Sequence, residues 1–396
     1  MVNKTELQLI LKHLRGHREP VYSDQVHMDA SLAWLIHAQD LTRTGGVAGF
    51  YSLLNGWHDA YPETTGYIIQ TFIDHYKECR DESFLTRALA MADWEIAIQL
   101  PNGGVRAFCL KRGLSNRPLV FDTGQVLLGW TSLYRYTKEP KYLAASLRAA
   151  HWLLENQETN GTWTNYIYRQ HCGAYHSRVA WAMLQVANDS ERDDLRDGAV
   201  AFLQQVLSQQ GTSGFFPNTG FKPRSHYFTH AIAYTLEGLI GASQELSNAQ
   251  LSKRLMGSVL LTCEPLLAQY TRTKTLYGEY QPDFRPTTTH YQCATGTAQL
   301  AWCFLKVFEY SHDQRYLHTA LAMIDDVKSM QVLRTGNSSL DGSIPGSYPL
   351  WGRYQRWRLV TWAAKFLCDA LLVKNAATST SPHTKPNETL PRKKIE

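Results

Sequence analysis

The chain has 396 residues, of which 44% are hydrophobic, 12% aromatic and 19% charged, and its formal net charge is +5. This composition predicts a globular protein with a large buried core and excludes a disordered chain. No stripe of Lys and Arg recurs at helical spacing, which argues against nucleic acid as a partner. No apolar run reaches the ~20 residues of a membrane span, and residues 1–18 lack the apolar core of a signal peptide, so we expect no membrane span and a cytoplasmic protein.

A repeat of about 58 residues organises the chain from its first element to its last. Residues 84–94, 142–152 and 316–326 resemble one another, and each copy follows a charged turn. The spacing predicts two weaker copies between them, at 193–208 and 250–269, and a further outer helix at about 28–41. Each such helix has a partner that opens on small residues. These inner helices are expected to start near residues 66, 124, 179, 231 and 296, with a sixth at about 360–373.

Six periods cover the chain from about residue 27 to residue 375, so its two ends should meet. We therefore predict an all-α protein, an (α/α)6 toroid of about six helical hairpins, in which the N-terminal helix closes the ring against the C-terminal helix. The expected organisation is an N-terminal extension at 1–23, one toroid at 24–375, and a disordered Thr/Ser/Pro-rich tail at 376–396.

Polar motifs lie where the inner helices begin, at residues 61–67, 121–125, 175–178, 226–230, 291–296 and 346–354. In a ring, these helix starts point to one end, where unpaired N–H groups favour anions. Six residues share the same phase of the repeat, and we expect most of them in one cavity of ~300–1,000 Å³. They are Glu63, Asp122, His176, His230, Cys293 and Tyr348.

Glu63 and Asp122 are the candidate catalytic pair, because glycosidic hydrolysis needs one carboxyl group to protonate the leaving oxygen and one to activate water. Either acid could instead cap its helix. His230 and Tyr348 are added as catalytic candidates for proton transfer. The expected substrate-binding residues are Tyr67, Gln125, His176, Arg178, His226, Tyr234, Cys293, Trp351 and Arg353. The histidines have no metal-site spacing, so no metal and no cofactor is expected.

Residues 157–163 match the QxxxGxW pattern of terpene cyclases, but the DxDD acid motif of the squalene–hopene type is missing. A terpene cyclase is therefore a weak alternative.

The motifs together resemble the six-hairpin glycosidase superfamily and, more narrowly, the VpsJ-like proteins of bacterial exopolysaccharide clusters. The resemblance covers about residues 24–374 and is carried by residues 62–67, 121–125, 178–182, 293–299, 344–349 and 362–366. It implies a part in making or trimming a surface polysaccharide. Residues 61–65 and 121–124 are also weakly similar to the C-terminal domain of glucuronyl C5-epimerases, although their order along the chain differs.

The resulting hypothesis is a carbohydrate-active enzyme, a glycoside hydrolase whose polysaccharide or oligosaccharide substrate carries uronic acid. One alternative is a polysaccharide lyase or C5-epimerase that uses a Tyr or His base with Arg178 or Arg353 on the carboxylate. Another alternative is a non-catalytic glycan-binding protein that works with polysaccharide-assembly proteins.

Overall fold

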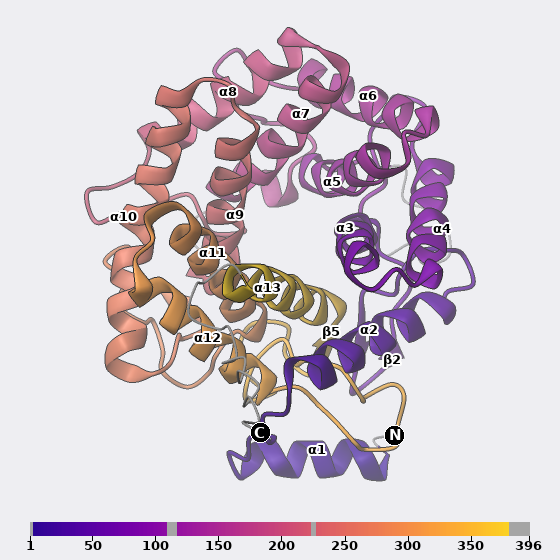
Figure 1. The fold of residues 1–396 in the computed structure, drawn as a ribbon, viewed down its shortest axis with the longest axis vertical. Coiled ribbons are helices and arrows are strands. Elements are labelled where there is room, and N and C mark those ends of the chain that lie inside the picture. Colours follow the sequence, from indigo (N-terminus) through magenta and orange to yellow (C-terminus); the bar gives the residue numbers. More distant parts are fainter. Residues whose placement is uncertain (1–2, 109–116, 223–226, 380–396) are drawn as a thin grey trace, which may run out of the picture.

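The computed structural model describes residues 3–108, 117–222 and 227–379. Within these ranges, six helices form an inner ring (Figure 1): α3 (Pro62–Cys79), α5 (Val120–Thr137), α7 (Ser177–Ser190), α9 (Thr229–Glu245), α11 (Ala294–Ser311) and α13 (Thr361–Ser379). Each inner helix packs on the next, and α13 packs on α3. The ring is therefore closed.

Six further helices surround this ring: α2 (Asp24–Asp40), α4 (Glu82–Ile98), α6 (Pro140–Glu155), α8 (Asp193–Ser208), α10 (Ala249–Thr273) and α12 (Gln314–Lys328). The first outer helix, α2, packs on the last inner helix, α13. Both the (α/α)6 toroid and its closure by the two ends of the chain are thus confirmed.

Small residues let the inner helices approach one another closely. A Cβ atom added to Gly66 would lie 2.6 Å from the Cα atom of Val126 on the neighbouring helix, and one added to Gly296 would lie 2.6 Å from the backbone nitrogen of His230. Contacts this short leave no room for a side chain. The glycines expected from the sequence at these helix starts therefore set the width of the ring.

A glutamine in the last turn of an outer helix or shortly after it ties most of these helices to the next one. Gln157 donates to the carbonyl of Gly161, 2.6 Å away, and to that of Gly198 on α8, 3.0 Å away. The same pattern of a nearby glycine carbonyl and a carbonyl on the next outer helix recurs at Gln39, Gln99, Gln210 and Gln331. The QxxxGxW motif is one copy of this structural clasp, so it gives no support to terpene chemistry.

The ring carries short additions at one end. Helix α1 (Lys4–Leu14), which belongs to the predicted extension, lies outside the ring (Figure 1). Strands β2 (Gly56–Trp57), β1 (Phe50–Ser52) and β5 (Arg358–Val360) form an antiparallel sheet in that order, and β3 (Tyr227–Phe228) pairs with β4 (Glu279–Tyr280). The repeat did not predict these strands, which lie in the loops before inner helices.

Helix α13 continues to Ser379, so residues 376–379 belong to the helix rather than to the predicted tail. The rest of that tail, 380–396, lies outside the described residues. None of the helices in the described ranges is long and apolar enough to cross a bilayer.

Candidate active site

A cavity of about 820 Å³ opens at the end of the ring where the inner helices begin. Helix α3 contributes Glu63 to its lining, α5 contributes Asp122, α9 contributes His230 and Tyr234, and α13 contributes Trp362. The loops between hairpins supply the rest of the wall. Residues from four inner helices thus converge on one space.

The two carboxyl groups are held by contacts other than helix capping. Glu63 accepts a hydrogen bond from the hydroxyl of Tyr61, and the hydroxyl of Tyr234 lies 3.4 Å away. Asp122 accepts from the backbone N–H of Phe108, at 3.2 Å, in the preceding loop. Glu63 and Asp122 lie in the first turns of α3 and α5, where a negative charge favours the helix N-terminus. Their contacts with Tyr61 and with Phe108 come in addition to that effect.

Burial sets the protonation of this pair. It raises the pKa of Glu63, against the opposing effect of its tyrosine hydrogen bonds and of the Arg178 charge. Burial also raises the pKa of Asp122 well above its usual range, and the negative charge of Glu63 raises it further. Two interacting carboxyl groups of this kind lose their protons in separate steps. One can hold a proton while the other is ionised, which is the state that acid–base catalysis requires.

His230 has a defined tautomer. Its Nδ1 atom lies 2.5 Å from the side-chain oxygen of Gln299, whose amide nitrogen donates to Glu237 at 3.1 Å. Because the Gln299 oxygen can only accept, Nδ1 carries the proton and Nε2 keeps its lone pair. Burial lowers the pKa of His230 to about 3, so the ring is neutral near pH 7. A neutral imidazole in the cavity wall can accept a proton.

Aromatic and cationic side chains make up much of the remaining wall. The aromatic rings, which suit the flat faces of sugars, are Phe50, Tyr61, Phe108, Phe121, Tyr168, Tyr175, Phe221, Phe228, Tyr234, Tyr354 and Trp362. The cations are Arg169, Lys222, Arg353, Arg356 and Arg358. Since Glu63 and Asp122 are the only acids among the lining residues that the structure describes, the cavity favours an anionic ligand.

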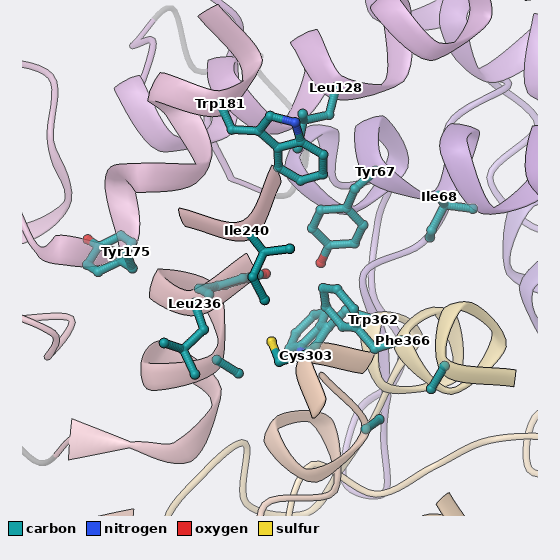
Figure 2. Close-up of a cluster of buried hydrophobic side chains, with 14 of the residues drawn as sticks. Tyr67, Ile68, Leu128, Tyr175, Trp181, Leu236, Ile240, Cys303, Trp362 and Phe366 are labelled. Atoms are coloured by element: carbon teal, nitrogen blue, oxygen red, sulfur yellow. The ribbon is translucent and has the colours of Figure 1, made fainter. Parts of the chain in front are cut away.

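Three of the expected substrate-binding residues lie inside the ring rather than on the cavity wall. Arg178 forms a buried ion pair with Glu237 and donates to the side-chain oxygen of Gln125 at 2.7 Å. The ring of Tyr67 lies 5.6 Å from that of Phe366, and Figure 2 shows both side chains pointing into the ring with Trp362 nearby. These residues support the inner helices from within.

Some of the other expected substrate-binding residues lie on the cavity wall, and some lie away from it. Tyr234 and Arg353 line the cavity, whereas His176 is fully buried, with its Nδ1 atom 3.0 Å from the carbonyl of Gly173. Cys293 is buried beside Tyr291 and Tyr354, and burial raises the pKa of its thiol to about 12, so it is no nucleophile near pH 7. His226 lies outside the described residues.

Two residues of the 346–354 motif point away from the cavity. The hydroxyl of Tyr348 donates to the carbonyl of His17 at 2.7 Å, and the guanidinium of Arg18 lies 4.0 Å from the centre of its ring. Trp351 packs against Trp357 instead. We expected most of the six residues of shared phase in one cavity, but only half of them line it: Glu63, Asp122 and His230 do, whereas His176, Cys293 and Tyr348 lie outside it.

Several residues of this site were not predicted from the sequence. Tyr61 and Tyr354 lie within the helix-start motifs, and both line the cavity. Arg356 and Arg358 follow the last motif directly, but no periodic signal marked them. Among the described residues, His, Cys, Asp and Glu form no group of three or more that could hold a metal ion.

No protein-family model matches this sequence, and no curated protein matches it. Solved structures do match its fold. One is an unsaturated glucuronyl hydrolase specific for heparin, 12% identical, with a TM-score of 0.68 over 89% of this chain and 97% of that chain. Another is a sugar epimerase from a ruminal bacterium, 13% identical, with a TM-score of 0.71 over 92% of this chain and 98% of that chain.

A third similar structure is a D-mannose isomerase, 12% identical, with a TM-score of 0.69 over 88% of this chain and 97% of that chain. At these identities the likeness shows a shared fold. The chain has the six-hairpin (α/α)6 toroid of these sugar hydrolases, epimerases and isomerases.

Proposed function

We propose that this protein is a carbohydrate-active enzyme that hydrolyses a glycosidic bond in an anionic glycan. The observation that carries this proposal is the pair of buried carboxyl groups, Glu63 and Asp122, that face one cavity with raised pKa values. The similar folds support a sugar as substrate, since they belong to proteins named as sugar hydrolases, epimerases and isomerases.

Asp122 is the general acid in this proposal and Glu63 the base. The pKa of Asp122 is the one that burial and a neighbouring negative charge raise together, so Asp122 keeps its proton longer. The pKa of Glu63 is raised too, but hydrogen bonds from two tyrosines favour its ionised form. Protonation of the leaving oxygen by Asp122 and activation of water by Glu63 would complete hydrolysis. The aromatic side chains of the wall would hold the sugar rings, and its cationic side chains would bind the negative groups of the glycan.

Tests of turnover should use uronic-acid oligosaccharides, with product release measured by chromatography. Asp122→Asn and Glu63→Gln should each lower kcat by about 10²–10⁴-fold, the usual range for a general acid or base. Asp197→Asn, at an exposed position on α8, is the matched control and should leave turnover unchanged. Full activity of Asp122→Asn would rule out its role as the acid.

A second candidate, a lyase, C5-epimerase or isomerase reaction, is favoured by His230. Its Nε2 atom keeps a lone pair that could accept a proton from beside a carboxylate or carbonyl group. Because the low pKa makes the free ring a weak base, this reaction needs a bound anion that raises the pKa of His230. Reactions in D2O separate the candidates, because an epimerase or isomerase incorporates deuterium at carbon and a hydrolase does not. A lyase would make an unsaturated product that absorbs ultraviolet light. Tyr348 has no part in this candidate, since its hydroxyl binds His17.

The biological setting that we propose is the making or trimming of a bacterial surface polysaccharide, together with polysaccharide-assembly proteins. It is supported by the resemblance of the helix-start motifs to exopolysaccharide proteins. A deletion strain with altered surface polysaccharide, restored by the wild-type chain and not by Asp122→Asn, would support both the setting and the reaction. Restoration by Asp122→Asn would favour the non-catalytic alternative.

A further inference from the structure

Helix α1 lies outside the ring (Figure 1), and its two faces differ in burial. Its inward face buries Glu6, Leu9 and His13. On the outward face the exposed fractions of Leu7, Leu11 and Leu14 are 52%, 40% and 63%. Residues spaced four and three apart lie on one side of a helix, so these leucines form a continuous apolar stripe. Such a stripe on the surface marks a place of contact.

The inward face fixes this orientation. Asn3 and Glu6 form a capping box at the start of α1, and the second carboxylate oxygen of Glu6 accepts from the hydroxyl of Tyr51 at 2.5 Å. Further along, the backbone N–H of Leu350 donates to Nδ1 of His13 at 3.3 Å. Because these contacts hold the buried side of α1, its leucines cannot turn inward.

The charges beside the stripe are positive. Lys4 and Arg15 are exposed at its two ends. Glu6, the acid within α1, is buried, and Lys12 is paired with Glu19. The outward face of α1 therefore combines three leucines with two cations that form no ion pair within residues 3–108, 117–222 and 227–379. A second copy of the same face would bring Lys4 or Arg15 against like charges in either orientation, which opposes self-association.

We propose that the outward face of α1, formed by Lys4, Leu7, Leu11, Leu14 and Arg15, docks this protein on a membrane surface that contains anionic lipids. An amphipathic helix in the interface buries its leucines at the level of the acyl chains, while its cations contact negative headgroups. This docking is independent of the reaction proposed above.

One loop connects α1 with the cavity wall. The loop before β5 contacts α1 and the segment after it through Leu350 and Tyr348, and the same loop supplies Arg353 and Arg356 to the cavity wall. The helix that meets the membrane and the cationic wall that meets the substrate are thus neighbours.

The test is co-sedimentation of the full chain with vesicles of phosphatidylcholine, either alone or with about one third phosphatidylglycerol. The wild type should sediment with the anionic vesicles, bind much less to the neutral ones, and be released by high salt. The triple variant Leu7→Gln, Leu11→Gln, Leu14→Gln should bind at least about tenfold more weakly, because it lacks the apolar stripe. Lys4→Gln with Arg15→Gln should also weaken binding.

Leu261→Gln is the matched control, because Leu261 is 45% exposed on the outer helix α10. It should bind like the wild type, and all variants should unfold at a similar temperature, since they change exposed side chains. Failure of the wild type to bind anionic vesicles, equal binding to neutral vesicles, or full binding by the triple variant would each overturn the proposal. So would a dimer in sedimentation velocity that the triple variant dissociates, because the face would then contact a second copy.

Discussion

The Nδ1 atom of His230 on α9 lies 2.5 Å from the side-chain oxygen of Gln299 on α11, and this contact gives the cavity a histidine of defined tautomer. Gln299 continues the contact to Glu237, which pairs with Arg178 on α7. A chain of buried polar groups therefore runs from the cavity wall across three inner helices.

Replacing Gln299 by Met should remove the hydrogen bond that orients the ring of His230, without filling the cavity. We expect kcat to fall by about tenfold, a magnitude typical of groups that orient a functional histidine, with little change in KM. NMR should show loss of the slowly exchanging Nδ1 proton. Unchanged kcat with an intact fold would show that the tautomer of His230 does not matter for turnover.

Glu63→Gln should lower the pKa of Asp122. The negative charge of Glu63 disfavours ionisation of Asp122 in the wild type, so its removal makes ionisation easier. A ¹³C NMR titration of the Asp122 carboxyl group measures this directly. The alkaline limb of any residual activity should move to lower pH with it, because the general acid then loses its proton earlier. An unchanged pKa would mean that the two carboxyl groups do not interact.

Glu95 on α4 is fully buried, and neither of its carboxylate oxygens has a hydrogen-bond partner in the described part of the chain. Burial raises its pKa well above the usual range, and the charge of Asp122 adds to this. The folded protein then keeps a proton that the unfolded chain releases. The free energy of unfolding contributed by Glu95 is therefore present below the unfolded pKa and decreases as pH rises toward the folded pKa.

Glu95→Gln should abolish this decrease in the free energy of unfolding with rising pH. The stability of the variant relative to the wild type should therefore increase between pH 5 and pH 8, as thermal unfolding across that range would measure. Glu155→Gln, an exposed change on α6, should show no such trend. A constant difference between Glu95→Gln and the wild type across this range would contradict the raised pKa.

Gln331→Ala should weaken the closure of the ring. The side-chain amide of Gln331 donates to the hydroxyl of Ser31 at 2.8 Å, to the carbonyl of Gly342 at 2.9 Å and to that of His27 at 3.3 Å. Buried acceptors that lose their donor cost about 1–3 kcal/mol each, so we expect a loss of at least about 2 kcal/mol in the free energy of unfolding. Urea unfolding measures it, with the exposed Gln250→Ala as control. A loss as small as that of Gln250→Ala would show that the ring closes without this clasp.

Arg356→Gln should test the anionic specificity of the cavity. Arg356 is exposed on the cavity wall and forms no ion pair with the residues that the structure describes, so its charge is available to a ligand. KM for a uronic-acid substrate should rise severalfold at low salt and less at high salt, because salt screens exposed charges. Arg254→Gln on α10 is the control. The same rise with a carboxyl-reduced substrate would exclude a charge effect.

Much of the fold could be predicted because a repeat leaves two independent marks on the sequence. The apolar face of each outer helix recurs at residues 84–94, 142–152 and 316–326, and small residues such as Gly66 and Gly296 recur where inner helices must approach closely. The total span then requires closure, as the packing of α2 on α13 confirms. The short strands and the glutamine clasps escaped prediction because each involves few residues between the periodic segments.

The sequence by itself determined the toroid and the end of the ring where polar residues gather, since the phase of the repeat fixes the height of a residue along the axis. The sequence did not determine the direction in which each of these polar side chains points. Glu63 lies in the first turn of α3 and faces the cavity, whereas Tyr348 lies in the loop before β5 and α13 and binds the segment after α1. Only tertiary structure decided this, because the direction of a side chain in or beside a loop depends on the loop path and on neighbours distant in sequence.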